Sequence, residues 1–382
     1  MILPSLDTQV YLAVCGKFHA FSLAREYALR GHLAGLYAAD QHFAPPAGVP
    51  SSRFHNRWDF KLWRIAGRYA PAVTGHSTKR EYAAFDRWID RCFDKLPGGV
   101  FHGWNTHVSQ TLKHLDPSLW LRCVERSCPH NLFQHRLLQE ESARLDLPYS
   151  ADADALEAAV QELYDADVIV APSQYSAGSY DDPVLRAKIR VNPLGANYSY
   201  REREATAPRP LRLLLVGNAF LRKGTHDLIE AFRLIDDPAA ELWIRGEVPP
   251  EYRRRIVDPR IKVFSAVTYE RLQRLYREAT MFCLPSVDEG FGMVALEALS
   301  YGLPVIYTDH CGVADVLTPA VGMRVPIRSA QAIAAAVRVI AGWRPEDFER
   351  FDQERAAVLA ATTWRNCADR MMRDVYRRPQ AS

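Results

Sequence analysis

The stretch PSVDEGFGMVALEALSYGLPVIYTD, residues 285–309, contains the pattern that decides the fold. Apolar residues lead up to Pro285, a loop with two glycines follows, and an apolar helix pattern then ends at Gly302, shortly before Pro304. Glycine and proline directly after a helix pattern are typical of a helix end. The apolar run that follows, 304–308, starts another strand. Short apolar strands separated by a helix indicate a parallel sheet that is buried on both faces.

The same alternation extends along the chain on both sides of a polar segment bounded by prolines, REREATAPRP (201–210). The expected strands cover residues 10–14, 167–173, 188–195, 211–217, 241–246, 261–267, 281–286 and 304–308. We therefore expect an α/β fold with two facing, Rossmann-like domains, 1–200 and 211–362, joined by a linker at 201–210. Ligands of such sheets bind at the carboxyl ends of the strands, so the cleft between the domains is the expected site.

Composition excludes several classes of protein. The chain has 382 residues, is 48% hydrophobic and 24% charged, and carries a formal net charge of +3, so a nucleic-acid partner is not expected. Its seven cysteines show no CxxC pairing and are typical of reduced thiols in a cytosol. The beginning, MILPSLDTQVYLAVCG, lacks the basic region of a signal peptide, and no run approaches the roughly 20 apolar residues that span a bilayer. We expect a cytoplasmic protein whose contact with a membrane, if any, is peripheral.

Two carboxylates, Glu289 and Glu297, flank the glycine loop of Gly290, Phe291 and Gly292. Glycine lets backbone N–H groups approach a ligand closely, and the helix amino terminus that follows favours a phosphate. Glu289 can then hold sugar hydroxyls or stabilise positive charge, while Glu297, inside the helix, can bind a ribose. The alternative is structural, with Glu289 as a helix cap and Glu297 as an exposed helix residue.

A second group of candidate residues lies in VGNAFLRKGTHDLIEAF (216–232), where Arg222 and Lys223 precede a helix expected from about Thr225. Adjacent cations in such a loop suit a diphosphate, arginine as a two-pronged donor and lysine as a point charge. Neither GxxxxGK[ST] nor GxGxxG is present. A solvated basic loop is the alternative interpretation.

These segments resemble family 4 of the retaining glycosyltransferases. PSVDEGFGMVALEALSYGLPVI is similar to the family signature, in which Glu289 and Glu297 are the two glutamates of the E-x7-E motif. VGNAFLRKG resembles the family's VGR…KG loop, and YDADVIVAPSQYSAGSY…KIRVNPLGAN resembles the segment that closes its first domain. The resemblance implies the GT-B fold with the last helix, 363–382, packing back on the first domain. It also implies a nucleotide-diphosphate sugar as donor, retention of the anomeric configuration, and no metal or other cofactor.

By position, the resemblance assigns donor-binding roles to Gly16, Arg222, Lys223, Gly290, Phe291, Gly292 and Glu297. Lys223 and Arg222 would bind the diphosphate, and Glu289 would hold the donor sugar and act in catalysis. Gly16 would let the donor phosphates approach the first domain. The chain departs from the family at Asn218, where an arginine is common, and Arg222 is expected to compensate.

The acceptor side is less clearly marked in the sequence. ERSCPH (125–130) resembles an acidic-Arg-x-Ser-x-His pattern found in part of the family, although its spacing differs, and Glu125 and His130 are therefore candidates for assisting proton transfer from the acceptor. His102, in VFHGWN, is a third candidate. For each of the three, the alternative is a residue that only caps or packs its own loop.

The segment RFHNRWDFKLWRIAGRY (53–69) has aromatic and aliphatic residues at helical spacing beside a stripe of arginines and lysine. A basic amphipathic helix of this kind can lie on an anionic membrane or meet a phosphate-bearing lipid acceptor. The alternative is a helix that packs its aromatic face on the first domain.

Together these features predict a metal-independent retaining transfer of a sugar to a glycan or lipid-linked acceptor, in lipopolysaccharide, other cell-envelope or exopolysaccharide synthesis. Two further hypotheses remain open. One is a GT-B sugar-nucleotide epimerase or hydrolase, and the other is a non-catalytic sugar-nucleotide-binding partner of another transferase.

Overall fold

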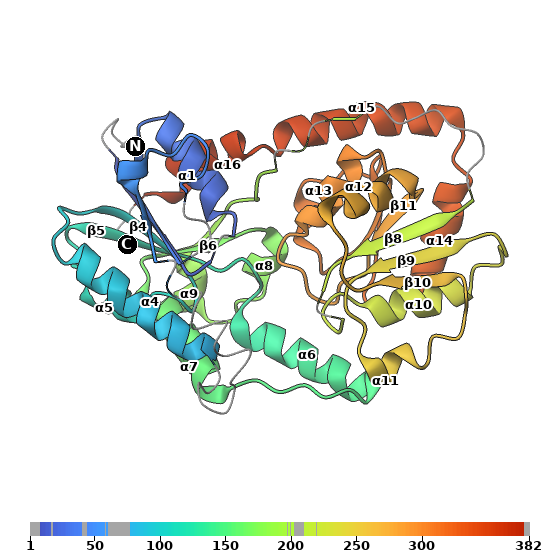
Figure 1. Cartoon of the computed structure of the whole chain (residues 1–382), viewed down its shortest axis with the longest axis horizontal. Coiled ribbons are helices and arrows are strands. Elements are labelled where there is room, and N and C mark those ends of the chain that lie inside the picture. Colours follow the sequence, from blue (N-terminus) through green and yellow to red (C-terminus); the bar gives the residue numbers. More distant parts are fainter. Residues whose placement is uncertain are drawn as a thin grey trace.

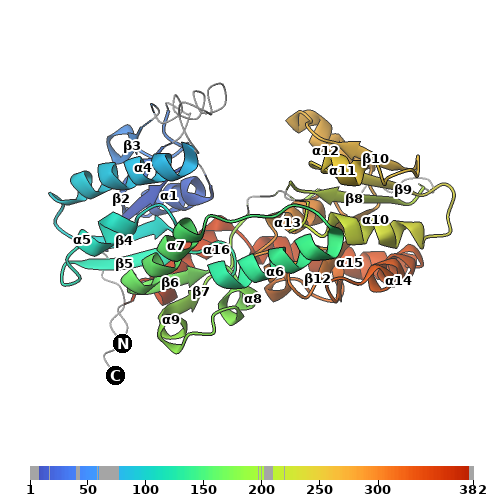
Figure 2. The same ribbon diagram turned by 90° about the horizontal axis from the view of Figure 1, so that it is seen from below.

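The computed structural model describes residues 8–16, 18–39, 44–57, 59, 77–196, 198, 200–201, 210–218 and 220–377. Within these ranges the chain forms two parallel sheets that lie side by side and are covered by helices (Figures 1 and 2). The predicted fold of two Rossmann-like α/β domains is confirmed.

The first sheet has seven strands in the order β3-β2-β1-β4-β5-β6-β7. They are β1 (Val10–Val14), β2 (Leu33–Ala38), β3 (Phe54–Asn56), β4 (Gly99–Trp104), β5 (Trp120–Glu125), β6 (Val168–Ala171) and β7 (Ile189–Val191). The helical elements of this part are α1 (Ala20–Leu29), η1 (Ser51–Arg53), α4 (Ser77–Phe93), α5 (Ser109–His114), α6 (Asn131–Leu145), α7 (Ala153–Asp165), α8 (Gln174–Gly178) and α9 (Pro183–Lys188).

The second sheet has six strands in the order β10-β9-β8-β11-β12-β13. They are β8 (Arg212–Val216), β9 (Glu241–Arg245), β10 (Ile261–Phe264), β11 (Met281–Leu284), β12 (Val305–Thr308) and β13 (Gly322–Val325). Its helical elements are α10 (Thr225–Arg233), α11 (Pro250–Arg253), α12 (Tyr269–Glu278), α13 (Met293–Ser300), η2 (Gly312–Asp315), α14 (Ala330–Ala341) and α15 (Pro345–Ala361).

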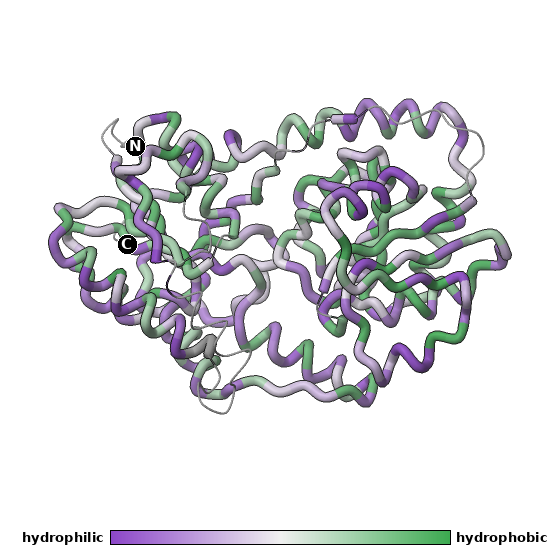
Figure 3. Tube along the Cα trace, in the orientation of Figure 1, coloured by the Kyte–Doolittle hydropathy of each residue, from purple (hydrophilic) through white to green (hydrophobic). Residues whose placement is uncertain are grey.

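Burial on both faces explains why the central strands are largely apolar. In β8, Leu213 and Leu215 face one hydrophobic cluster, whereas Leu214 and Val216 face another. Successive strand side chains point to opposite faces, so a strand covered by helices on both sides has no polar face. Figure 3 shows the result, because the strands of the second sheet are mostly hydrophobic while α15 carries many hydrophilic residues.

The segment after α15 lies against the first domain. α16 (Trp364–Arg370) and the π-helical turn η3 (Met371–Val375) follow α15, and α16 lies beside α1 (Figure 1). The hydroxyls of Tyr27 and Tyr376 are 3.0 Å apart, and Arg30 Nε donates to Asp369 Oδ1 over 3.0 Å. The first domain is therefore built from both the beginning and the end of the described chain.

The prediction of a helix over residues 53–69 is wrong for Phe54–Asn56. Phe54–Asn56 forms the edge strand β3, paired in parallel with Leu36–Ala38 of β2. A strand pairing satisfies backbone groups that β2 would otherwise leave open at the sheet edge, and this outweighs the helical spacing of the side chains. Trp58 and residues 60–69 lie outside the described residues, as do 202–209 of the expected linker. None of the described helices is long and apolar enough to cross a membrane.

Helix α6 connects the two domains through buried charges. Its Glu141 side chain is fully buried and meets Arg328 of the second domain, His226 Nε2 at 3.1 Å, and Arg144 of its own helix at 2.8 Å. Arg144 also pairs with Asp227 at 2.9 Å. We call Glu141, Arg144, His226, Asp227 and Arg328 the α6 cluster. Ligand atoms of Glu141, His226 and Asp227 lie within 4.8 Å of one another, a spacing that could hold a metal ion, but the two arginines already neutralise these carboxylates.

Candidate active site

The loop between β11 and α13 is fixed in place by the loop after β12. Glu289 N–H donates to the His310 carbonyl over 3.0 Å, and Gly312 N–H donates to the Glu289 carbonyl over 2.9 Å. These two bonds form an isolated parallel bridge between Glu289 and Cys311 beyond the ends of their strands. The Glu289 side chain is thereby held at the carboxyl edge of the second sheet, where ligands of doubly wound sheets bind.

The loop between β8 and α10 packs directly against it. Gly224 has a φ of 59°, and an added Cβ there would come within 1.9 Å of the Pro285 carbonyl oxygen. Val287 N–H also donates to the Arg222 carbonyl over 3.0 Å. Glycine is therefore required at 224, both for the left-handed backbone and for the close approach of the two loops.

Lys223 and Arg222 meet Glu289 in this contact. Lys223 Nζ donates to Glu289 Oε2, and Arg222 Nη1 lies 3.5 Å from the same oxygen and donates to the Asp288 carbonyl over 3.2 Å. The Lys223 and Glu289 side chains are only 8% and 12% exposed. Burial alone would raise the pKa of Glu289, but the charges of Lys223 and Arg222 lower it below its usual value. The site therefore contains an ionised carboxylate and two cations, and an incoming phosphate would compete with Glu289 for them.

The glycine loop also contacts the first domain. The Gly290 carbonyl accepts hydrogen bonds from Ser173 Oγ at 2.7 Å and Ser176 Oγ at 3.2 Å. A Cβ on Gly290 would lie 2.1 Å from the Ser127 carbonyl oxygen. Within the described part of the chain, the N–H groups of residues 290–292 have no acceptor. They remain available to a ligand at the start of α13. The helix begins directly after Gly292, whose φ is 98°.

Glu297 lies four residues into α13 beside tyrosines, so it is not the exposed helix residue of the alternative interpretation. Tyr276 Oη donates to its Oε2 over 3.1 Å, and Arg201 stacks 4.3 Å from the centre of the Tyr301 ring nearby. Burial raises the pKa of Glu297, although the Tyr276 hydrogen bond and the charge of Arg201 oppose the shift. In the described structure Tyr276 occupies one carboxylate oxygen, which leaves the other for a ligand hydroxyl.

Glu125 is the last residue of β5 and is buried in a network of side chains. Its Oε1 accepts from His19 Nε2 and from Ser127 Oγ at 2.9 Å, and its Oε2 lies 3.4 Å from His102 Nε2. His102, completely buried on β4, turns its Nδ1 to the Tyr376 hydroxyl at 2.7 Å. Glu125 is 2% exposed and His102 0%, so burial keeps both side chains from direct contact with a substrate.

His130 is not brought together with Glu289. It stands before α6, its backbone N–H donates to Ser179 Oγ over 2.8 Å, and its ring packs edge-on against Tyr180 at 4.9 Å. Burial, with the charge of Arg126, lowers the pKa of His130. Gly16, at the end of β1, has a φ of 127°, which allows the sharp turn towards α1.

Three functional contacts were missed from the sequence. Asp288, fully buried, accepts from Gln134 at 2.5 Å and from Tyr175 at 2.8 Å, both in the first domain. Ser127, inside ERSCPH, touches the glycine loop, and His19 faces Glu125. Asp288, next to Glu289 in the signature, and Ser127, inside ERSCPH, carried signals that could have been used, whereas His19 did not.

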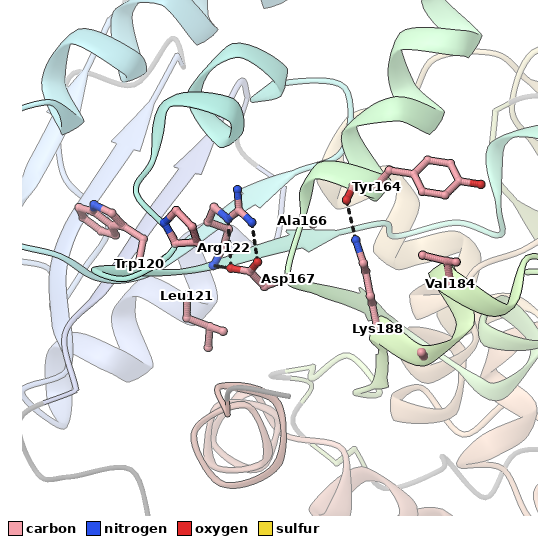
Figure 4. A pocket seen from close by; sticks show the side chains of 10 residues that line it. Trp120, Leu121, Arg122, Tyr164, Ala166, Asp167, Val184 and Lys188 are labelled. Atoms are coloured by element: carbon pink, nitrogen blue, oxygen red, sulfur yellow. Dashed lines mark hydrogen bonds and ion pairs between the residues drawn. The ribbon is translucent and has the colours of Figure 1, made fainter. Parts of the chain in front are cut away.

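A pocket also opens at the other edge of the first sheet, near the starts of β5 and β6 (Figure 4). Arg122 pairs with Asp167 at 2.6 Å, and Lys188 Nζ donates to the Tyr164 carbonyl over 2.5 Å. Because it lies at the amino ends of these strands, the pocket is separate from the carboxyl edge that carries the residues above.

Solved structures and curated proteins are similar to this chain. Sucrose-phosphate synthase from Thermosynechococcus elongatus superposes with a TM-score of 0.67 and 20% identity, covering 95% of this chain and 97% of that one. Anabaena Alr3699/HepE, solved with UDP and glucose, gives a TM-score of 0.61 and 14% identity over 95% and 98% of the two chains. These likenesses show the fold, which is that of the GT-B glycosyltransferases.

Two relatives are similar over part of their length. The putative colanic acid biosynthesis glycosyltransferase WcaL of Salmonella typhimurium is 28% identical over 184 residues, 44% of this chain and 43% of that protein. The amylovoran biosynthesis glycosyltransferase AmsK of Erwinia amylovora is 30% identical over 166 residues, 39% of this chain and 40% of that protein. The chain thus spans about two fifths of the length of these relatives. Residues 199–347, which include most of the second domain, match the family described as Glycosyl transferases group 1.

Proposed function

We propose that this protein transfers a sugar from a nucleotide-diphosphate sugar to a glycan or lipid-linked acceptor, with retention of configuration and without a metal. The observation that carries the proposal is the contact of Lys223 and Arg222 with Glu289 beside the unpaired N–H groups that precede α13. Cations and a helix amino terminus can hold a diphosphate, and a carboxylate beside them can hold sugar hydroxyls. The setting would be cytoplasmic synthesis of a cell-envelope or extracellular polysaccharide, in line with the two relatives.

In the proposed reaction the bond between the anomeric carbon and the phosphate oxygen breaks, and its electron pair leaves with the diphosphate. Lys223, Arg222 and the N–H groups of the glycine loop stabilise that charge. Glu289, released from Lys223 by the arriving phosphate, faces the sugar as positive charge develops on the ring. Glu297 binds the ribose through the carboxylate oxygen that Tyr276 leaves open.

The first experiment is a thermal-shift screen of the full chain with UDP-glucose, GDP-mannose, ADP-glucose and dTDP-glucose. A donor at a hundred times its Kd raises the free energy of unfolding by about 2.7 kcal/mol. Lys223→Met should weaken the binding of that donor ten- to a hundredfold, as expected for a lost hydrogen bond between charged groups of about 1.5–3 kcal/mol. Lys113→Met is the matched control, because its side chain is 56% exposed on α5.

Turnover of the bound donor then tests the chemistry. The anomer of the product, read by NMR, tests retention, and unchanged rates after chelator treatment test independence from metal. If none of the four donors shifts the melting temperature, or if Lys223→Met and Lys113→Met behave alike, the proposed function is wrong.

A further inference from the structure

The first domain contains a histidine–carboxylate pair that the sequence motifs did not mark. His19 stands before α1, three residues after Gly16, and its Nε2 meets Glu125 Oε1. The two side chains are 8% and 1% exposed. His19 follows β1 and Glu125 ends β5, so the pair lies at the carboxyl edge where ligands of such a sheet bind.

Glu125 determines which nitrogen of His19 carries a proton. Burial by itself would raise the pKa of Glu125, but His19 and His102 lower it far below its usual value, so the carboxylate stays ionised and only accepts hydrogen bonds. Nε2 of His19 must therefore carry the hydrogen. Nδ1 has no partner in the described part of the chain and, in a neutral ring, presents its lone pair.

Two tryptophans hold the imidazole in this orientation. Trp364 of α16 stacks on His19 with ring centres 5.6 Å apart and planes 12° apart, and Trp104 meets it edge-on at 5.4 Å. A ring fixed by stacking, with one nitrogen bound to a carboxylate and the other open, has the arrangement of a general base.

Ser127 connects this pair to the proposed donor site. Its Oγ donates to Glu125 Oε1 over 2.9 Å, and its carbonyl oxygen lies 2.1 Å from where a Cβ of Gly290 would be. A single residue thus touches both the carboxylate that holds His19 and the loop that faces the donor sugar. Ser127 thus joins the His19–Glu125 pair to the loop that carries Glu289.

We propose that His19 is the base that takes the proton of the acceptor hydroxyl, and that Glu125 positions it. The proposal rests on the proposed glycosyl transfer. In the step, the acceptor O–H proton passes to His19 Nδ1 and the acceptor oxygen bonds to the anomeric carbon. The bond from that carbon to the phosphate oxygen breaks, and its electron pair leaves with the diphosphate. The imidazolium that forms is stabilised by Glu125, and it later returns its proton to water.

The test uses nucleophiles that do and do not carry a proton. Release of the nucleoside diphosphate from the donor that stabilises the wild-type protein is measured in water alone and in sodium azide. Water must lose a proton to react, whereas azide has none to lose. His19→Ala should slow the reaction with water about a hundredfold, within the usual contribution of a general base, and azide should restore most of the rate as a glycosyl azide.

Two more variants keep the test decisive if His19→Ala folds poorly. His19→Gln retains a polar side chain, and Glu125→Gln offers an N–H to Nε2 and so favours the opposite tautomer. Both should show the same loss with water and the same recovery with azide. His114→Ala, whose side chain is 62% exposed on α5, is the matched control and should match wild type.

Calorimetry with the donor separates this proposal from the proposed function. Wild-type protein that binds no donor contradicts the function itself. If the folded His19 variants bind donor normally and react with water within twofold of wild type, His19 is not the base. If their rates fall and azide fails to restore them, His19 has only a structural role, and the proposal is equally overturned.

Discussion

Removing the charge of Glu141 should lower the free energy of unfolding far more than removing the charge of its neighbour, Glu140. Glu141 is fully buried and meets Arg144, His226 and Arg328, whereas Glu140 is 47% exposed and pairs with Arg328 at 2.8 Å. The change Glu141→Gln removes a buried counter-charge of Arg144, His226 and Arg328, which then share Asp227 and Glu140. Glu140→Gln removes one surface pair from a neighbouring position on the same helix.

The structure sets the size of the difference. Burial would raise the pKa of Glu141, but His226, Arg144 and Arg328 lower it from 4.5 to about 2, which corresponds to roughly 3 kcal/mol. Because the arginine partners are partly exposed to solvent, we reduce this contribution to the free energy of unfolding to about 2 kcal/mol. Breaking a buried ion pair by removing one partner typically costs about 3–5 kcal/mol. We expect Glu141→Gln to lower the free energy of unfolding by about 2–4 kcal/mol and the melting temperature by roughly 5–15 °C. Glu140→Gln should cost less than about 1 kcal/mol.

The assay is thermal and urea unfolding of both variants, followed by circular dichroism at pH 7 and again in acid. Because the pKa of Glu141 is lower in the folded state, its contribution is complete above about pH 4.5 and disappears as the pH falls towards 2. The gap between wild type and Glu141→Gln should therefore close in acid. Equal losses for the two variants at pH 7, or a gap that persists in acid, would refute the assignment of this buried charge.

Three other outcomes are expected. Asp227 and Glu141 outweigh burial and raise the pKa of His226, so protonated His226 stabilises the folded protein fully below about pH 6.5 and less as the pH rises. The difference in melting temperature between wild type and His226→Asn should therefore shrink from pH 6 to pH 9, and a constant difference would contradict this. Gly224→Ala should lower the free energy of unfolding in urea by more than about 2 kcal/mol, because the backbone φ is 59° and the new Cβ would lie 1.9 Å from the Pro285 carbonyl oxygen. A decrease of less than about 1 kcal/mol would show that the two loops separate easily. In Gly290→Ala the new Cβ would lie 2.1 Å from the Ser127 carbonyl oxygen of the other domain, so hydrogen exchange at Ser176 should increase and kcat/KM should fall at least tenfold with little change in melting temperature. Unchanged exchange at Ser176 would exclude this clash.

The sequence predicted β1, β6 and β7 of the first sheet and β8 to β12 of the second, because most of these strands read as short apolar runs, but it did not predict β2, β4, β5 or β13. It failed at Phe54–Asn56, where helical spacing of aromatic residues concealed an edge strand that forms only because β2 lies beside it. For the candidate site, the motif placed Glu289 and Lys223 in loops, and the structure brings them together. Contacts such as Gln134 with Asp288, 154 residues apart, could not be read from local pattern, because they exist only once both domains are built.

His19 shows the same limit in another way. A lone histidine near a glycine is unremarkable in a sequence, and its pairing depends on Glu125, 106 residues further on, and on Trp364 near the end of the described chain. The sequence did select Glu125, but for direct participation in catalysis. The structure buries Glu125 against His19, a contact that could not be predicted from the local sequence.

The return of residues 364–376 to the first domain has a consequence for how the protein is made. Tyr376 completes the buried hydrogen-bond network of His102 and Tyr27, and Trp364 covers His19. During synthesis the ribosome releases the whole second domain before it releases these residues. The first domain is therefore translated first but completes its folding last. In a nascent chain stalled before Trp364, the side chains of His19, Tyr27 and His102 would remain exposed to water.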